Sequence, residues 1–392
     1  MKIQYNKSAL VTDGIWRKSL AVVRALSTAG IKVGLGERTW MNSAFFSRHA
    51  DYRYIYPSLE KNPDIFLNWL VSFVKSNKFD VLITPEEGTS LFIAQHFSEI
   101  SPYIRIPLAS YEILKFVRDK SKLLEHAIKI GIPCPKMFLC HVPEDAKRQV
   151  NELSFPVVLK PAISSGGQGI RYVFDKSTLS ADAQIISNGY DSFLMQEYIP
   201  GTEYYGLSVI FNQRNQMRSA FVHKKIRQLP ITGGASTYAV SVKYPKLVEI
   251  AEALLTSINW YGAANIEFKI DQNDNIPKLM EINPRLWGSL QLAIASGINI
   301  PYLLYQLALE GDIKPSFEYK EGIKFRWFMY GDFVNFFTNL IMKKRFDLGN
   351  LKLLERNNCH ATWSLSDPLP YFVGLPLALI DYMVSDEMER FR

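Results

Sequence analysis

The first third of the chain alternates short apolar runs with helix patterns, and this alternation restricts the fold more than any other feature. Apolar runs at residues 9–12, 31–35 and 79–84 have the length of buried strands. Helix patterns begin near Arg17 and at Pro63, each with apolar side chains at helical spacing. Strands and helices that alternate in this way form a parallel sheet with helices on both faces. The sequence therefore predicts an α/β domain at the start of the chain.

The turn after the first of these strands argues against a dinucleotide cofactor. Residues 12–16 contain one glycine, Gly14, whereas nicotinamide and flavin sites on such sheets use a G-x-G-x-x-G turn.

The charge pattern argues against binding of nucleic acid. The net charge of +7 is spread thinly, with its densest cluster at residues 223–227, and nonspecific nucleic-acid binders carry a basic stripe or tail. A small anionic ligand is the expected partner instead.

Size and composition predict a folded protein of two or three domains, because the chain has 392 residues, of which 47% are hydrophobic. Its cysteines, Cys134, Cys140 and Cys359, are too few for a disulfide framework and lack metal-ligand spacing. The first residues lack the apolar segment of a signal peptide. The longest apolar stretch, 370–384, is interrupted by a proline and an aspartate and is shorter than the roughly 20 residues of a membrane span. We expect a cytoplasmic protein without membrane association, in which 370–384 is a buried helix; the alternative is a helix resting on a membrane surface.

A glycine-rich segment follows a strand that ends in a lysine. The strand 155–161 contains Lys160, and the segment that follows consists of Ser164, Ser165, Gly166, Gly167, Gln168 and Gly169. Glycines leave backbone N–H groups free to approach a phosphate, and the lysine adds a point charge. The segment does not open a helix with Gly-Lys-Ser/Thr, so it is not a Walker A loop. Its alternative interpretation is a flexible hairpin turn.

Two later strands carry carboxylates on one face. In the strand 264–270 the apolar residues alternate with Glu267, and in 278–283 Glu281 and Asn283 share a face. If the two strands pair, these three side chains converge. Carboxylate and amide oxygens suit Mg²⁺. The alternative, a solvent-facing sheet surface, does not account for the Pro-Arg turn directly after Asn283.

The order of these segments closely resembles the ATP-grasp superfamily, the fold of carbamoyl-phosphate synthetase large chains, biotin carboxylase and D-alanine ligase. The resemblance covers about residues 110–312 and includes these segments in order: Lys120, residues 158–161, the serine-glycine loop, residues 196–203, Ile266-Glu267 and residues 280–285. It implies an α/β and α+β architecture in which a βαβ, Rossmann-like pre-ATP-grasp domain precedes the ATP-grasp fold. The implied boundaries are 1–115 for the first domain, 116–312 for the ATP-grasp domain (lid about 125–195, core about 196–312) and 313–392 for an aromatic-rich C-terminal extension.

The resemblance also implies a role for each motif residue. Lys120 and Lys160 would contact the phosphates of ATP, and the loop from Ser164 to Gly169 would close over them. The remaining implied roles are adenine contacts at Glu197, Tyr198 and Ile199, ribose binding by Glu203, ligation of two Mg²⁺ ions (Mn²⁺ being possible) by Glu267, Glu281 and Asn283, stabilisation of the transferred phosphoryl group by Arg285, and a basic strand, Lys225 and Arg227, before a substrate loop at 230–236.

The implied activity is an ATP-dependent carboxylate–amine (or carboxylate–thiol-type) ligase that forms an amide or peptide-like bond through an acyl phosphate. The partners would be small-molecule carboxylate and amine substrates, and a homodimer is common among similar proteins. One alternative is a carbamoyl-phosphate-synthetase-like or carboxylase activity on bicarbonate, and another is a catalytically inactive ATP-binding scaffold. For the acceptor, Glu86 or Glu87 could hold an ammonium group, although acidic residues also favour a helix N-terminus. Aromatic residues between 325 and 337 are expected to pack rather than line a pocket.

Overall fold

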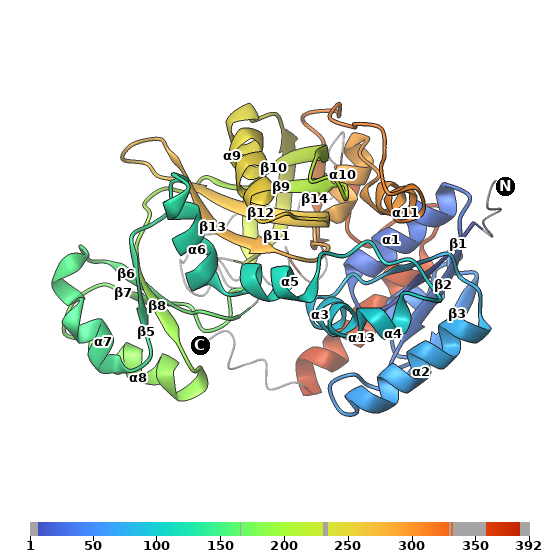
Figure 1. The fold of residues 1–392 in the computed structure, drawn as a ribbon, viewed down its shortest axis with the longest axis horizontal. Coiled ribbons are helices and arrows are strands. Elements are labelled where there is room, and N and C mark those ends of the chain that lie inside the picture. The colour runs from blue at the N-terminus through green and yellow to red at the C-terminus, as the bar shows by residue number, and fades with distance from the viewer. Residues whose placement is uncertain (1–6, 165, 230–233, 329–330, 332–357, 385–392) are drawn as a thin grey trace.

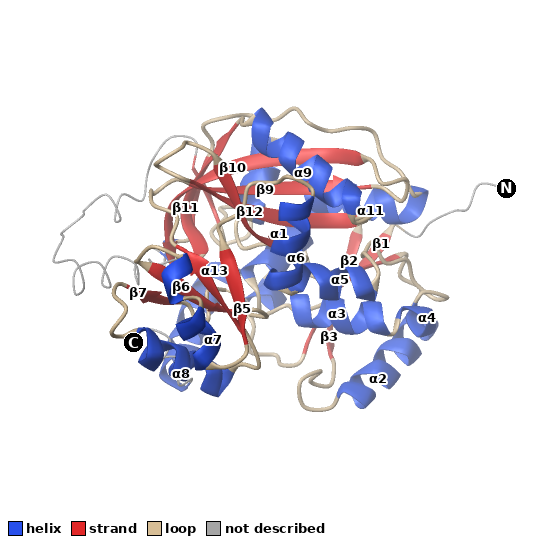
Figure 2. Cartoon of the chain, turned by 60° about the vertical axis from the view of Figure 1, so that its left-hand side comes forward, coloured by secondary structure: helices blue, strands red, loops and turns tan. Residues whose placement is uncertain are grey.

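The computed structural model describes residues 7–164, 166–229, 234–328, 331 and 358–384. In these residues the strands form three sheets: a four-stranded sheet near the N-terminus, a second four-stranded sheet in the middle of the chain and a seven-stranded sheet between them in space (Figure 1). Helices cover the sheets on the outside, as Figure 2 shows from a second direction.

The N-terminal sheet is parallel, with the strand order β3-β2-β1-β4. Its elements are β1 (Ser8–Val11), α1 (Arg17–Thr28), β2 (Lys32–Glu37), the 3-10 turn η1 (Ser43–Phe46), β3 (Tyr52–Ile55), α2 (Pro63–Ser76), β4 (Val81–Ile83), α3 (Glu87–Gln95) and α4 (Phe97–Ile100). Ala9 and Val11 face α1, and Leu10 between them faces α2 to α4, so both faces of the sheet are covered. This confirms the parallel α/β arrangement that the alternating sequence predicts.

The middle sheet is antiparallel and has a hydrophobic core of its own. Its elements are β5 (Met137–Cys140), α7 (Pro143–Arg148), the 3-10 turn η2 (Val150–Glu152), β6 (Val157–Pro161), β7 (Arg171–Val173), α8 (Leu179–Gly189) and β8 (Phe193–Glu197). The strand order is β5-β8-β6-β7. Leu159, Phe193 and Ile186 belong to a buried cluster drawn only from this part of the chain. We refer to residues 137–197 as the lid; in Figure 1 it lies on the left, far from the N-terminal sheet.

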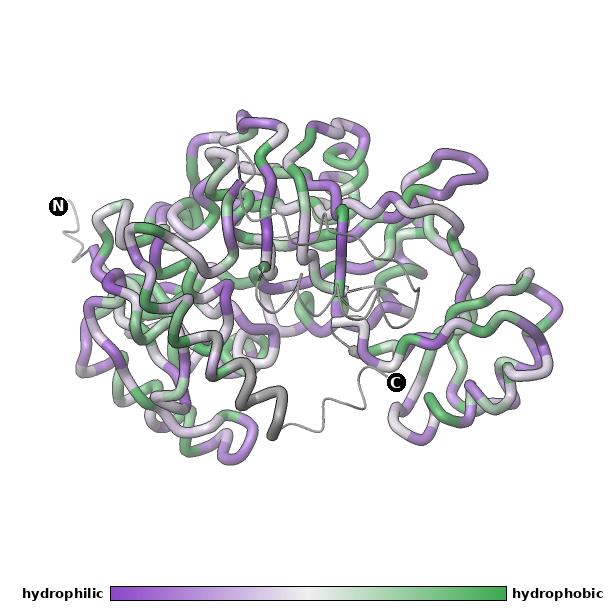
Figure 3. Tube along the Cα trace, turned by 180° about the vertical axis from the view of Figure 1, so that it is seen from behind, coloured by the Kyte–Doolittle hydropathy of each residue, from purple (hydrophilic) through white to green (hydrophobic). Residues whose placement is uncertain are grey.

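The seven-stranded sheet has the order β13-β12-β9-β10-β11-β14-β15. Its elements are β9 (Tyr204–Phe211), β10 (Met217–Leu229), β11 (Ala235–Val242), β12 (Gly262–Ile270), β13 (Pro277–Asn283), β14 (Lys324–Arg326) and β15 (Asn358–His360), with the helices α5 (Tyr111–Arg118), α6 (Lys120–Lys129), α9 (Pro245–Ser257), α10 (Leu290–Ser296) and α11 (Ile300–Glu310). Leu207 and Ile266 pack with side chains of α5, α6 and α9 on one face of the sheet. On the opposite face, Ile210 and Phe221 pack with side chains of α10 and α11, and the rest of that face borders a cleft. The polar turn between β12 and β13 projects at the edge, and Figure 3 shows it as hydrophilic.

The N-terminal sheet and the seven-stranded sheet share one hydrophobic core. Side chains of β1, β2, β4 and α1 form a single buried cluster with side chains of α10, α11 and β14, and Leu26, Leu290 and Phe325 are examples. Arg17 adds a polar link, since its Nε donates to the Gly288 carbonyl (3.1 Å) and its guanidinium lies 3.6 Å from the centre of the Trp327 ring. These two sheets therefore form one packed body.

The C-terminal residues join both sheets. β14 and β15 extend the large sheet, and α13 (Leu369–Val384) contacts η1 beside the N-terminal sheet. Asp367 is 2% exposed; it accepts hydrogen bonds from Ser47 and from the Arg48 amide and forms an ion pair with Arg24 (2.8 Å). Much of the aromatic segment expected to pack, 332–337, lies outside the described residues.

No single helix in the described part of the chain has the length and hydropathy of a membrane span; α10 and α11 reach them only as a pair bent by 88°. At the start of α13, Leu369 and Phe372 are 57% and 59% exposed. Within the segment 370–384, which was expected to be a buried helix, Pro370 is buried and Tyr371 is half-buried, whereas Phe372 is exposed.

Candidate active site

A cleft lies between the lid and the open face of the seven-stranded sheet. It is lined by side chains of β6, β8, β9, β10, β12 and β13, by the segment that joins β6 to β7 and by the segment that follows β13. Strand alternation explains much of the lining, because Lys225, Glu267 and Asn283 line the cleft while residues beside them, such as Ile266, Phe268 and Ile282, pack with the helices behind the sheet.

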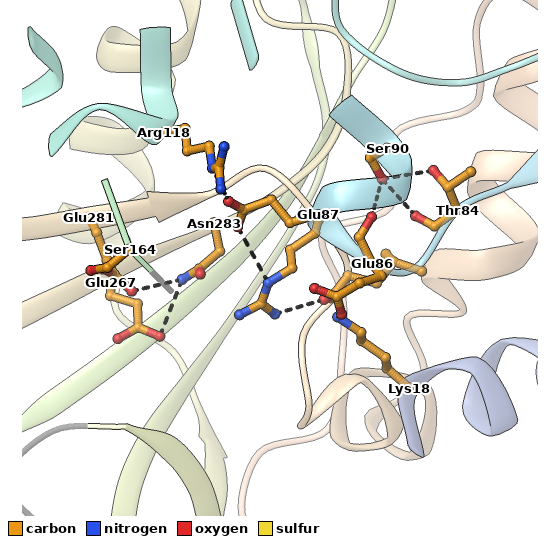
Figure 4. Close-up of polar contacts among 12 residues, drawn as sticks. Lys18, Thr84, Glu86, Glu87, Ser90, Arg118, Ser164, Glu267, Glu281 and Asn283 are labelled. Carbon is orange, nitrogen blue, oxygen red and sulfur yellow. Dashed lines mark hydrogen bonds and ion pairs between the residues drawn. The ribbon is translucent and has the colours of Figure 1, made fainter. Parts of the chain in front are cut away.

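Two carboxylates occupy opposite positions on neighbouring strands. β12 and β13 pair in the register that sets Glu267 opposite Glu281 and Asn265 opposite Asn283. Asn283 Nδ2 lies 3.2 Å from Glu281 Oε1 and 3.5 Å from Glu267 Oε1, so the amide joins the two carboxylates. The three side chains therefore converge on one point, as Figure 4 shows.

The two carboxyl groups ionise differently. Burial raises the pKa of Glu267, and the charge of Glu281 adds to this rise, while Lys225 opposes it. Burial also opposes ionisation of Glu281, but Lys120, Lys160 and Lys225 outweigh burial and lower the pKa of its carboxyl. Glu281 therefore carries the more persistent negative charge of the pair.

The donor set fits a hard cation that keeps several water ligands. Among the described residues, no group of three or more His, Cys, Asp or Glu side chains has metal-binding geometry; the cluster at Glu267 and Glu281 offers two carboxylates and one amide. Mg²⁺ in phosphate-binding sites takes only one or two carboxylates and completes its shell with water and phosphate oxygens. Asn283 turns its amide nitrogen to the carboxylates, so it would ligate a cation through its oxygen after a flip of the amide.

Two lysines approach the carboxylates from the lid side. Lys120, the first residue of α6, is 7% exposed; its Nζ donates to the Ser164 carbonyl (2.7 Å) and lies 3.8 Å from Glu281 Oε2. Lys160, on β6, is 6% exposed. Burial, and to a lesser extent the charge of Lys120, lower the pKa of Lys160 to about 8. Two buried cations beside one another provide a site for polyanions.

The glycine-rich segment reaches the cleft with only part of its length. Ser164, Gly166 and Gly167 line the cleft, whereas Gln168 and Gly169 are not among the lining residues. Ser165 lies outside the described residues. Gly166 and Gly167 have φ of +64° and +79°, a conformation in which glycine avoids the steric penalty of a side chain.

The end of β8 and the segment that follows it also line the cleft. Glu197, Tyr198 and Ile199 line it, and the Glu197 carboxylate also accepts a hydrogen bond from the Lys136 amide (3.0 Å). Glu203, expected at a ribose, is not a lining residue. It is paired with Lys224 and accepts a hydrogen bond from the Tyr205 hydroxyl (3.2 Å).

The two basic residues predicted on β10 take different positions relative to the cleft. Lys225 is 7% exposed, lines the cleft and contacts Glu267 Oε2 (2.7 Å). Arg227 is not a lining residue, and its guanidinium lies 4.4 Å from the centre of the Tyr238 ring. The cause is a register irregularity of β10 against β11 on both sides of Arg227. Of the predicted substrate loop, residues 230–233 lie outside the described residues.

Arg285 is held by a chain of charges from the N-terminal part. Its Nε lies 3.8 Å from Glu87 Oε2, and Glu87 Oε1 accepts a hydrogen bond from Arg118 Nε (2.7 Å). Glu86, next to it, is paired with Lys18 (2.5 Å). Figure 4 shows Glu86 with Lys18, and Glu87 with Arg118, beside the carboxylate cluster. Both glutamates considered for an ammonium group therefore already have cationic partners, and Glu87 orients Arg285.

Several lining residues were not predicted as site residues. Four of them present a buried polar atom that has no hydrogen-bond partner in the described part of the chain: Gln196 Nε2, His223 Nδ1, Asn265 Oδ1 and Trp287 Nε1. The sequence holds a signal for two, because His223 and Asn265 stand two residues before Lys225 and Glu267 on their strands and so share their face. Trp287 has no such signal.

Two family models match overlapping parts of the chain. The model described as a RimK-like ATP-grasp domain matches residues 117–217, and the model described as ATP-grasp in the biosynthetic pathway with Ter operon matches residues 190–329. Together the matched residues extend from the end of α5 to β14, and they contain the whole cleft lining.

The known proteins to which this chain is similar have several different activities. The carbamoyl phosphate synthase large chain of Mycobacterium sp. (strain JLS) is 24% identical over 302 residues, which is 73% of this chain; the chain spans only 27% of that protein's length. The biotin carboxylase domain dimer of Hydrogenobacter thermophilus 2-oxoglutarate carboxylase, in complex with MgADP, ADP and bicarbonate, has a TM-score of 0.68 at 18% identity and covers 82% of this chain and 74% of its own. The L-amino acid ligase from Bacillus licheniformis has a TM-score of 0.62 at 17% identity and covers 80% and 78%. These structures share the fold.

Proposed function

The chain belongs to the ATP-grasp superfamily of ATP- and Mg²⁺-dependent enzymes, and we propose that it is a carboxylate–amine ligase that forms an amide or peptide-like bond through an acyl phosphate. The observation that carries the proposal is the convergence of Glu267 and Glu281 with Lys120, Lys160 and Arg285 on one cleft between the lid and the large sheet. A carboxylate is a poor electrophile, and phosphorylation gives it a good leaving group.

The charged residues have distinct tasks in this proposal. Lys120 and Lys160 hold the phosphates of ATP, while Ile199 and Tyr198 contact the adenine. Glu267, Glu281 and Asn283 would hold Mg²⁺, which would supply positive charge against the phosphate oxygens. Arg285, oriented by Glu87, stabilises the charge on the transferred phosphoryl group.

The reaction itself proceeds in two steps. The substrate carboxylate oxygen attacks the γ-phosphorus and ADP leaves, which gives an acyl phosphate. The amine then attacks the acyl carbon and phosphate leaves, while the amine proton passes to solvent or to the phosphate. The lid excludes water from the acyl phosphate during the interval, because hydrolysis would waste it.

The experiment is an ADP-release assay with Mg-ATP and pools of amino acids, small carboxylates and bicarbonate, with hydroxylamine as the trapping amine. Turnover that depends on one carboxylate and yields a hydroxamate supports the ligase. Turnover with bicarbonate alone would instead support a carboxylase-type activity, which the resemblance to carbamoyl phosphate synthase and biotin carboxylase structures favours as the second candidate. ATP binding without turnover in any pool would point to an inactive scaffold.

We expect the proposed enzyme to form a homodimer and to be located in the cytoplasm. The structurally similar Hydrogenobacter thermophilus domain is a dimer. The three cysteines are all free thiols, which suits a reducing compartment. Sedimentation of the purified chain would test the dimer.

A further inference from the structure

The cleft lining contains neutral polar groups that the proposed phosphoryl transfer does not use. We call this part of the lining the inner pocket and define it by His223, Asn265 and Trp287. All three side chains line the cleft and are 2%, 3% and 4% exposed. Each has a polar atom without a hydrogen-bond partner in the described residues: His223 Nδ1, Asn265 Oδ1 and Trp287 Nε1. Buried polar atoms are almost always paired, with protein groups or with water, and a molecule bound in the cleft is in position to supply partners to these three.

The register of the large sheet places the inner pocket beside the carboxylate cluster. Glu281, Glu267, Gly206 and His223 lie directly opposite one another across four neighbouring strands, in that order. A Cβ on Gly206 would come within 2.3 Å of the His223 ring, so the imidazole lies across the glycine, toward Glu267. A small molecule whose reactive group lies at the carboxylate cluster can therefore also reach the imidazole.

The unpartnered atoms define the chemistry of the group they would bind. The indole Nε1–H of Trp287 can only donate, and the Asn265 Oδ1 atom can only accept. His223 is neutral, because burial and then the charge of Lys225 lower its pKa to about 3. Its Nε2 lies 3.3 Å from the Ser289 hydroxyl, which can donate or accept, so Nδ1 is available in either role.

A group that both donates and accepts satisfies all of these atoms. A carboxylate only accepts and would leave the Asn265 oxygen unpaired; an ammonium only donates and would leave the indole N–H unpaired. A hydroxyl or a carboxamide does both. We propose that the inner pocket selects the acid substrate, and that it binds acids carrying a hydroxyl or carboxamide close to the reactive carboxylate through His223, Asn265 and Trp287. This inference rests on the proposed ligase function, because it takes the ligand to be the acid.

The test follows the indole N–H signal of Trp287 by nitrogen–proton NMR, which does not require turnover. The chain has seven tryptophans, and the Trp287 signal is the one that the Trp287→Phe variant lacks. The protein is saturated with Mg²⁺ and a nonhydrolysable ATP analogue and then titrated separately with glycolate, N-acetylglycine, acetate, glycine and malonate. We expect the signal to shift with glycolate or N-acetylglycine at concentrations about tenfold below those needed for acetate, glycine or malonate, since a buried hydrogen bond changes affinity by about that factor.

Variants identify the groups responsible. His223→Asn is expected to raise the dissociation constant for the preferred acid about tenfold, whereas the matched control His126→Asn, at a histidine on α6 that bonds Ser257, leaves it unchanged. A Trp287 signal that does not move with any acid, or that moves equally with all five, overturns the inference. ADP release measured in parallel separates the two proposals. A selective shift without turnover would retain the inner pocket and refute the ligase, and acid-dependent turnover with an unmoved signal would do the reverse.

Discussion

Raising the pH above 8 is expected to weaken ATP binding through Lys160. Burial and the nearby charge of Lys120 lower the pKa of Lys160 to about 8 in the free protein, and Glu281 opposes that shift. Bound phosphates favour the charged form, so the pKa must rise when ATP binds. Above pH 8 most of the free protein has lost the proton of Lys160 and must take it up again when ATP binds. The affinity for ATP therefore falls as the pH rises.

The size of the effect follows from the position of that pKa. With a pKa of about 8, roughly nine-tenths of Lys160 is charged at pH 7 and roughly one-tenth at pH 9. If the complex keeps the lysine charged throughout, the dissociation constant of ATP rises about tenfold between these two values, which is about 1.4 kcal/mol. Binding at pH 9 then takes up about 0.9 proton, against about 0.1 at pH 7.

Calorimetry with Mg²⁺ and a nonhydrolysable ATP analogue measures both quantities, when each titration is repeated in two buffers of different ionisation enthalpy. Lys160→Met is expected to bind more weakly at pH 7 and to lose most of the proton uptake at pH 9. Lys269 is the matched control, because it also lines the cleft and its pKa is also lowered to about 8 by burial. The Lys269→Met variant should keep the proton uptake at pH 9 that Lys160 contributes. If Lys160→Met shows the same pH dependence as the unaltered protein, the assignment of Lys160 to the phosphates is refuted.

Three further substitutions test the rest of the site and its support. Glu281→Gln should lower Mg-ATP turnover at least a hundredfold by removing the more persistently charged carboxylate, with an unchanged melting temperature as the control; near-normal turnover would contradict the metal assignment. Glu87→Gln should lower kcat about tenfold while the KM for ATP stays the same, because it loosens Arg285 without touching the nucleotide; a change confined to KM would count against it. Asp367→Ala should lower the free energy of unfolding by about 3 kcal/mol in urea, since it leaves the charge of Arg24 without its buried partner, and a cost near zero would show that the pair contributes nothing.

The carboxylate cluster was accessible from the sequence because it depends on local alternation. Glu267 alternates with apolar residues on one strand and Glu281 on the next, and a short polar turn joins the two strands, so their pairing follows from chain connectivity. The parallel N-terminal sheet was also predictable, because strand and helix patterns alternate along that part of the sequence. Its strand β3 was not predicted, because the residues Tyr52–Ile55 are mostly exposed and form no apolar run.

Features that depend on distant contacts could not be predicted. Arg227 stands two residues after Lys225, but a register irregularity turns its side chain to Tyr238. Glu203 is withdrawn from the cleft by Lys224, a partner 21 residues away in the sequence. Arg17 bonds Gly288 from 271 residues away, and no local pattern connects them.

The distribution of hydrophobic cores also bears on how such a chain can evolve. The lid has a core of its own, whereas the N-terminal sheet and the large sheet share one. Recombination that replaces residues 137–197 exchanges most of one core as a unit, and the new lid must match the cleft and the contacts that Leu194 and Met137 make with the core of the large sheet. Recombination near residue 110 would separate helix α1 from α10 and α11, whose side chains fill the same interior. Gene fusion and domain exchange are therefore expected to be tolerated at the borders of the lid, and the first hundred residues to be inherited together with the large sheet.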